Sequence, residues 1–220
     1  MKIPKAVVAT TNAHKFREFM QIASNLGWNA ELIPLSHFPD APAVVEDGNT
    51  YEENAKKKAL EISKFCQVPA LAEDSGMEVK ALEGFPGVTS RRFFDDIAKQ
   101  KNCQDYASAQ HESNKEILRW LEEKEFEDRD AKYVSVACIA FPDCTFVCAR
   151  GENRGRIADS ERGSSGFGFD PIFLPQEFEY ERTFGELGQD LKNTVSHRRR
   201  ALEALVKKIQ VFEPNPVSKP

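Results

Sequence analysis

Short apolar stretches that alternate unevenly with amphipathic ones constrain the fold of this chain more than any other feature. The opening KAVVATT has the composition of a buried strand. The segment HKFREFMQIASNLG then places Phe16, Phe19, Met20 and Ala23 at helical spacing, and Gly27 ends the helix. The chain therefore begins with a strand, a polar turn and a helix.

The remaining elements are predicted from the same kinds of signal. Thr50 followed by Glu53 has the form of a capping box, which predicts a helix from Tyr51 to about Phe65. The other expected elements are, in order, a strand over 30–35, a strand over VPALAEDSG that MEVKAL continues or pairs with, a turn at GFPGV, a helix from Gln104 to about Phe126, a hairpin of KYVSVACIAF and TFVCARG, a strand from Arg154 to Ala158, and a helix from about Asp190 to Ile209. This uneven alternation favours a mixed α/β sheet over a strictly doubly wound one.

Composition excludes several classes of protein. A chain of 220 residues with 30% charged residues and a net charge of −5 suits one globular domain and disfavours broad nucleic-acid binding. No apolar run is long enough to span a membrane, and MKIPKAVVATT lacks the apolar core of a secretory signal, so we expect a cytoplasmic protein. The five cysteines are odd in number and form no CxxC pair, which favours reduced thiols that are neither zinc ligands nor nucleophiles.

The polar turn TTNAHK between the first strand and helix is the first candidate site. A helix N-terminus offers unpaired N–H groups and partial positive charge, which suits a phosphate, with Lys15 as counter-charge. The turn has neither of the common glycine-rich phosphate motifs, and Thr11 and Asn12 could equally serve only as helix caps.

Acidic residues form the second candidate. In LAEDSG, Glu73 and Asp74 leave an apolar strand on opposite faces, and Glu46 with Asp47 forms another acidic pair. Carboxylates at a strand end can hold Mg²⁺, whose retained waters a neighbouring carboxylate can deprotonate. A solvated turn is the competing interpretation.

Two further segments offer groups for a flat, anionic ligand. In SSGFGFDP, small residues allow close approach to a ligand, Phe167 or Phe169 could stack on a base, and Asp170 could accept from a base N–H. In KNTVSHRRRAL, cations at the start of a helix oppose its dipole, which suggests an anionic ligand. Taken singly, these are equally a turn with core phenylalanines and a solvated charged face.

Together and in this order, the segments resemble the non-canonical purine nucleoside-triphosphate pyrophosphatase family, also called the inosine triphosphate pyrophosphatase family. The resemblance runs through VVATTNAHKFRE, the acidic pair before EENAKKKAL, LAEDSGMEVKALEGFPGVTSRRF, GFGFDPIF and LKNTVSHRRRAL. It implies a long mixed twisted sheet with flanking helices, forming two lobes of one domain (1–220) around a nucleotide cleft. It also implies a homodimer and Mg²⁺-dependent hydrolysis of inosine, deoxyinosine and xanthosine triphosphates to monophosphate and pyrophosphate.

The resemblance also assigns residues, by matching positions. Asp74 looks like the catalytic acid–base residue, and Glu46 and Asp74 look like the metal ligands. The substrate contacts that it implies are Thr10, Thr11, Asn12, Ala13, His14 and Lys15 for the triphosphate, Ser75 beside the catalytic acid, Phe167, Gly168, Phe169 and Asp170 for the base, and Lys192, His197 and Arg198 for the base and phosphates.

Three positions depart from the family pattern: Thr11 and Arg199 stand where glycine is usual, and Glu73 stands where aspartate is common. The Arg199 change bears on the base pocket and leaves the phosphate and metal groups intact. A related hydrolase of pyrimidine or modified nucleotides, and a nucleotide-binding regulator without turnover, remain alternatives. The presence of both Glu46 and Asp74 favours catalysis, since a mere polyanion binder gains little from carboxylates.

Overall fold

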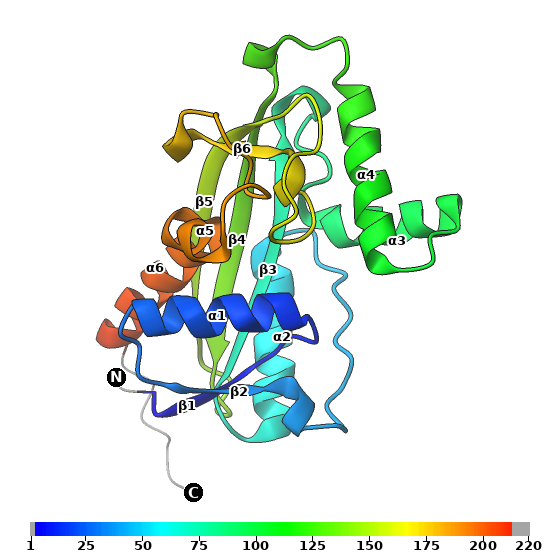
Figure 1. Ribbon diagram of the computed structural model, residues 1–220. Coiled ribbons are helices and arrows are strands. Elements are labelled where there is room, and N and C mark those ends of the chain that lie inside the picture. The colour runs from blue at the N-terminus through cyan, green and yellow to red at the C-terminus, as the bar shows by residue number, and fades with distance from the viewer. Residues whose placement is uncertain (1–2, 213–220) are drawn as a thin grey trace, which may run out of the picture. The chain divides into compact units, whose positions relative to one another are not determined.

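The computed structural model describes residues 3–212 of the chain (Figure 1). The helices and strands follow one another in chain order as β1 Lys5–Val8, α1 Ala13–Asn25, β2 Glu31–Pro34, α2 Tyr51–Cys66, β3 Ala70–Val79, α3 Ser90–Lys101, α4 Tyr106–Trp120, β4 Asp130–Ala140, β5 Phe146–Ile157, β6 Phe173–Pro175, α5 Gln189–Val195 and α6 His197–Val211. None of the helices in this part of the chain is long and apolar enough to cross a membrane.

The six strands form one sheet in the order β2-β1-β3-β4-β5-β6. β1 pairs in parallel with both β2 and β3, whereas β5 and β6 pair antiparallel. Parallel and antiparallel pairs in one sheet, together with the helices, confirm the predicted mixed α/β class. β3 begins with five buried residues in succession, which is the pattern of a strand covered on both faces.

The chain divides into two compact units, each with its own apolar core. The first unit comprises residues 3–74, 135–151 and 198–212 of the described chain, and the second comprises 75–134 and 152–197. The first core joins residues of α1, β3 and α6, including Phe19, Leu71 and Leu202. The second joins residues of α3, α4 and β6, including Phe93 and Ile117, and Figure 1 shows α3 and α4 side by side.

Helical segments account for three errors of the sequence-based prediction. The helix expected over residues 104–126 is shorter, because Asp105 caps its N-terminus by accepting from the Ser108 N–H and the helix ends at Trp120. The preceding helix α3 was not predicted. The single helix expected over residues 190–209 is two helices, since Ser196 adopts an extended conformation between them. The i, i+4 spacing of Asn193 and His197, which on one continuous helix would place both side chains on the same face, therefore does not do so.

Strand boundaries were closer to expectation. β3 continues through MEV as far as Val79, so this segment continues the strand and does not form a separate partner for it. The separate strand expected from Arg154 is instead the end of β5, which runs without interruption from Phe146. Gly155 lies within β5 and packs closely against β6. A Cβ at this position would lie 2.3 Å from the Leu174 carbonyl oxygen, which explains why the residue is glycine.

The expectation that all five cysteines are reduced thiols was wrong for two of them. Cys138 of β4 and Cys148 of β5 form a disulfide, with their Cα atoms 4.1 Å apart. The two residues are ten positions apart on neighbouring strands joined by a turn. The spacing in sequence gives no sign of the pairing, because it depends on the register of the hairpin. The other three cysteines, Cys66, Cys103 and Cys144, are free.

We expect reducing agent to lower the free energy of unfolding by about 2–3 kcal/mol, because opening a loop of this length restores chain entropy to the unfolded state. Urea unfolding with and without a phosphine reductant measures the change. The double variant Cys138→Ala/Cys148→Ala should be insensitive to the reductant, as its matched control. Identical midpoints for the unmodified protein in both conditions would contradict a stabilising disulfide.

Candidate functional site

The turn before α1 is built by side chains that cap the helix. Asn12 Oδ1 accepts from the backbone N–H groups of His14 at 2.9 Å and Lys15 at 3.2 Å, and Thr10 Oγ1 accepts from the Asn12 N–H at 3.1 Å. Thr11, Ala13 and His14 are exposed, and Lys15 is partly buried. The capping role that the sequence allowed is thus present, and the polar surface of this turn faces outward beside it.

The N-terminus of α2 fixes the acidic loop that precedes it. Thr50 and Glu53 form the predicted capping box. One turn further, Asn54 is buried and uses both ends of its amide: Oδ1 accepts from the Gly48 N–H at 2.8 Å, and Nδ2 donates to Asp74 Oδ2 at 2.9 Å. The loop that carries Glu46 is therefore tied to the strand that carries Asp74.

Lys58, four residues after Asn54, completes this connection. Its ammonium donates to Glu46 Oε1 at 2.8 Å and to the Glu73 carbonyl oxygen at 2.7 Å. Asp47 instead pairs at the surface with Lys57 at 2.7 Å, and that hydrogen bond lowers the pKa of Asp47. Of the two acidic residues in the loop, Glu46 bonds to the buried Lys58, whereas Asp47 bonds to Lys57 at the surface.

Asp74 has the electrostatic environment of a proton acceptor. Burial raises the pKa of its carboxyl, against the lowering effects of Lys58 and Lys15, and repulsion from Glu46 raises it as well. The influence of Glu46 on Asp74 means that the two carboxylates lie within electrostatic range of each other. A raised carboxyl pKa brings the group nearer to the pH at which it can exchange protons.

The donor set fits Mg²⁺. No cluster of three or more His, Cys, Asp or Glu side chains arranged for a metal occurs in residues 3–212. Mg²⁺ commonly binds through one or two carboxylates and completes its shell with waters and substrate phosphates. Glu46 and Asp74 supply that pair of hard oxygen ligands, so these are the residues that would hold the ion.

Glu73 lies at the centre of a buried ion network. Its carboxylate contacts Lys15 Nζ at 2.8 Å, Ser135 Oγ at 2.9 Å and Arg198 Nη2 at 3.1 Å. Arg198 also pairs with Glu18, and its side chain is 1% exposed. Burial lowers the pKa of the Lys15 ammonium, but the charges of Glu73 and Asp74 and the hydrogen bond to Glu73 together outweigh this, so the pKa is raised. The Arg198 guanidinium, at the start of α6, is thus bound to the carboxylates of Glu18 and Glu73 in the same chain.

The second unit holds the base-loop residues that the sequence predicted. We define the base loop as residues 164–170. The Asp170 carboxylate is buried and accepts from the Phe167 N–H at 2.8 Å, from Lys192 Nζ at 2.6 Å and from Tyr133 Oη at 3.3 Å. Lys192 Nζ also lies 5.0 Å from the centre of the Phe167 ring. Gly166 is required here, since a Cβ would meet Asp170 Oδ2 at 2.0 Å.

The structure separates the two phenylalanines of the loop. Phe169 is 2% exposed and packs against Phe94, with ring centres 4.6 Å apart, so it is a core residue. Phe167 is partly exposed and remains the ring available for stacking. His197 is buried and stacks on Tyr133 at 4.4 Å, while Ser75 lies partly buried on β3 directly after Asp74.

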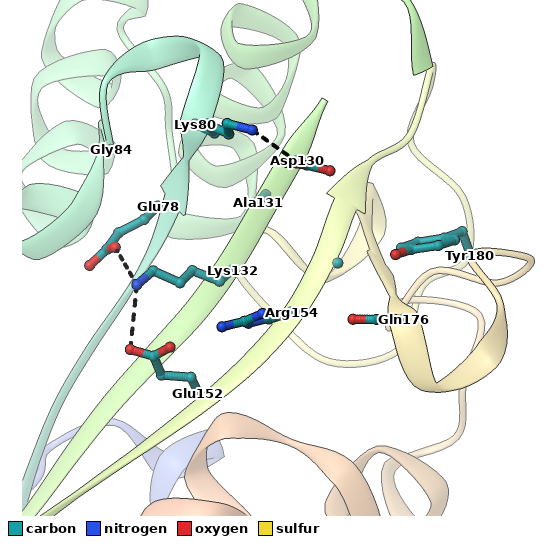
Figure 2. Close-up of a pocket in the computed structure, with 11 residues that line it drawn as sticks. Glu78, Lys80, Gly84, Asp130, Ala131, Lys132, Glu152, Arg154, Gln176 and Tyr180 are labelled. Carbon is teal, nitrogen blue, oxygen red and sulfur yellow. Dashed lines mark hydrogen bonds and ion pairs between the residues drawn. The ribbon is translucent and has the colours of Figure 1, made fainter. Parts of the chain in front are cut away.

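A pocket of about 510 Å³ lies elsewhere in the second unit and contains none of the predicted site residues (Figure 2). Figure 2 shows Lys132 between Glu78 and Glu152, at 3.2 and 3.4 Å, and Lys80 beside Asp130. These ion pairs balance much of the charge that lines the pocket. We therefore assign no ligand to it.

Comparison with known proteins decides the family. Residues 6–208 match the model of the Ham1 family. The chain belongs to the Ham1 family. A Geobacter sulfurreducens protein named dITP/XTP pyrophosphatase is 41% identical over 201 residues, which cover 91% of this chain and 94% of that protein. A protein of the same name from Deinococcus radiodurans is 39% identical, covering 93% and 92%.

Solved structures of the Ham1 family agree in fold. A HAM1 protein from Coxiella burnetii matches with a TM-score of 0.77 at 31% identity and covers 96% of this chain and 100% of its own. A Mycobacterium abscessus structure titled nucleoside-triphosphatase / dITP/XTP pyrophosphatase matches with a TM-score of 0.68 at 34% identity, covering 93% and 99%. The resemblance inferred from the motifs is thereby confirmed at the level of family and fold.

The motif analysis of this Ham1 family member missed five residues that bond to the predicted site residues: Glu18, Asn54, Lys58, Tyr133 and Ser135. Asn54 and Lys58 carried a detectable signal. They share the buried face of α2 with Ala55 and Ala59, and a polar side chain on an apolar helical face implies a specific partner. Glu18 carried the same signal, because it shares the buried face of α1 with Phe19, Ile22 and Ala23. Tyr133 and Ser135 gave no comparable signal, because they lie on a strand and their partners come from distant parts of the chain.

We expect Arg198→Ala to destabilise the protein by about 3–5 kcal/mol, because it leaves Glu18 and Glu73 buried without their shared cation. Urea unfolding followed by circular dichroism measures the loss. Arg200→Ala, on the exposed side of the same helix, is the control and should change stability by less than about 0.5 kcal/mol. A similar small effect at Arg198 would show that the network contributes little to folding.

Proposed function

We propose that this protein is a Mg²⁺-dependent nucleoside-triphosphate pyrophosphatase that converts inosine, deoxyinosine and xanthosine triphosphates to the monophosphate and pyrophosphate, removing non-canonical purines from the nucleotide pool. The relatives named dITP/XTP pyrophosphatase support the reaction and the substrate class. Action in the cytoplasm and assembly as a homodimer are part of the proposal and rest on the resemblance to the family.

One observation carries the proposal: two carboxylates, Glu46 and Asp74, are linked through Lys58 and Asn54 in a cluster that also contains Lys15. Carboxylates repel a triphosphate unless a cation lies between them, so their combination with lysines suits a metal-bound polyphosphate. We assign the phosphates to this cluster, with Lys15 and Lys58 as counter-charges and the turn at 10–15 as the donor of polar contacts.

In the proposed reaction, Asp74 accepts a proton from water as the water oxygen attacks the α-phosphorus and the bond to the bridging oxygen of the β-phosphate breaks. Burial of Asp74 raises its pKa and makes it a better proton acceptor. Lys15 and Lys58 offset the charge that develops on the phosphate oxygens. Bound Mg²⁺ would supply Lewis-acid polarisation of those oxygens, held by Glu46 and Asp74. The leaving group is pyrophosphate.

We assign the base to the second unit, where Phe167 offers a stacking face and Lys192 lies beside it. An ammonium group donates hydrogen bonds and accepts none, so it favours the 6-keto oxygen of hypoxanthine or xanthine over the 6-amino group of adenine. In this arrangement, Asp170 orients Lys192 and the loop. His197 stacks on Tyr133, whose hydroxyl donates to Asp170, and so supports the base loop within the second unit. Arg198, bonded to Glu18 and Glu73, belongs to the network that holds Lys15 in the first unit.

We expect inosine and xanthosine triphosphates to exceed adenosine triphosphate in kcat/KM by about 5-fold to 100-fold, the cost of one mismatched buried polar group. A pyrophosphate-release assay over a nucleotide panel, with and without Mg²⁺, measures this. Preferential hydrolysis of pyrimidine nucleotides would favour the alternative of a related hydrolase that acts on pyrimidine or modified nucleotides. Binding of nucleotides without turnover would favour the alternative of a nucleotide-binding regulator. Equal rates on inosine and adenosine triphosphates would overturn the proposed base recognition while leaving a less selective pyrophosphatase.

We expect Asp74→Asn to fold normally, since an asparagine oxygen can still accept from Asn54. Its kcat should fall by about 10²- to 10⁴-fold or more, the range expected for the loss of a general base. The loss combines a missing proton acceptor with a weakened metal ligand. Single-turnover hydrolysis of inosine triphosphate measures it, with the exposed Asp96→Asn as control. Near-normal turnover in Asp74→Asn would remove this residue from the mechanism.

A further inference from the structure

The base loop is held by a side chain of helix α4 that no motif singled out. Asn114 is 1% exposed, and its Nδ2 donates to the Gly168 carbonyl oxygen at 3.2 Å and to Glu161 Oε1 at 2.7 Å. Glu161 lies just before the loop, and its other oxygen pairs with His111 of the same helix. One amide thus binds the loop and the segment that leads into it.

The chemistry of these partners requires a donor at this position. Both groups that face Asn114 Nδ2 are acceptors, so only an NH₂ group satisfies them together. The opposite atom, Asn114 Oδ1, is buried and has no hydrogen-bond partner within residues 3–212. The donor end of the Asn114 amide is therefore the end that bonds to the loop and to the segment before it.

Gly168 is the point of the loop where such an anchor has most effect. It adopts a left-handed conformation, with φ of +66°. It lies in sequence between Phe167, which is partly exposed, and Phe169, whose ring is packed in the core. Phe169 is fixed by Phe94, and Phe167 is fixed through its N–H by Asp170. The Gly168 carbonyl held by Asn114 restricts rotation of the peptide between Gly168 and Phe169, and so limits the backbone freedom of the loop segment that carries Phe167.

We propose that Asn114 is a positioning residue for nucleobase selectivity, which holds Gly168 so that the base loop keeps Phe167 and Lys192 in the arrangement that discriminates between purines. The proposal rests on the function proposed above for the base loop. It does not involve the phosphate cluster, since all of the contacts that carry it lie within the second unit.

Two variants separate the hydrogen bonds from the volume of the side chain. Asn114→Ala removes both, whereas Asn114→Asp keeps the size but replaces the amide with a carboxyl that faces Glu161 and the Gly168 carbonyl. Ser113→Ala is the matched control, because Ser113 is also buried on α4 and its hydroxyl donates to Ala109 within the helix. Circular dichroism and urea unfolding establish which variants fold.

The first measurement does not depend on the proposed function. Amide hydrogen exchange of the ligand-free protein should become about tenfold faster across residues 164–170 in both Asn114 variants, as expected for the loss of a buried hydrogen bond. Exchange around Asp74 and exchange in Ser113→Ala should stay as in the unmodified protein. Unchanged exchange in the base loop would overturn the anchoring role.

The second measurement addresses selectivity. The ratio of kcat/KM for inosine over adenosine triphosphate should fall about tenfold in both Asn114 variants, while inhibition by pyrophosphate stays unchanged because it reports the phosphate cluster alone. An unaltered ratio, or the same fall in Ser113→Ala, would overturn the proposal. If the unmodified protein hydrolyses neither nucleotide, the proposed function fails, and the same ratio is then taken from equilibrium binding of the two nucleotides.

Discussion

The buried pairing of Arg198 with Glu18 and Glu73 is the interaction on which the first unit depends. It joins α6, α1 and β3, three elements from widely separated parts of the chain, at one guanidinium. Because Glu73 also holds Lys15, the position of that lysine follows from the network. Asp74, on the opposite face of the same strand, then takes its place beside Asn54 and Lys58. Because these charges are buried away from water, the geometry is rigid: if one group moved away, it would leave a buried charge without its partner.

Local patterns in the sequence were sufficient for most of the sheet and for the helices that carry strong caps. Thr50 and Glu53 placed the start of α2 correctly, and the apolar run KYVSVACIAF indicated the strand that the structure has as β4. Prediction failed where a single residue determines the backbone. Ser196 looks compatible with a continuous helix, yet it is extended, and His197 directly after it stacks on Tyr133.

The site shows the same division between local and distant information. Motifs singled out Asp74, Glu46 and the base loop as candidates, because the chemistry that these residues offer is visible in the residue types. They did not distinguish Phe167 from Phe169, since that depends on Phe94 packing against one ring and not the other. The pairing of Cys138 with Cys148 was hidden for a similar reason, as strand register cannot be read from spacing.

The metal and phosphate groups belong to the first compact unit, and the base loop with its anchors belongs to the second. Under the proposed function, the residues that carry out hydrolysis and the residues of the base loop that choose the base form two separate sets, one in each unit. Substitutions that retune the base preference can therefore accumulate in the second set without disturbing catalysis. Such a division gives natural selection a means to diversify substrate range within one family while the reaction itself stays constant.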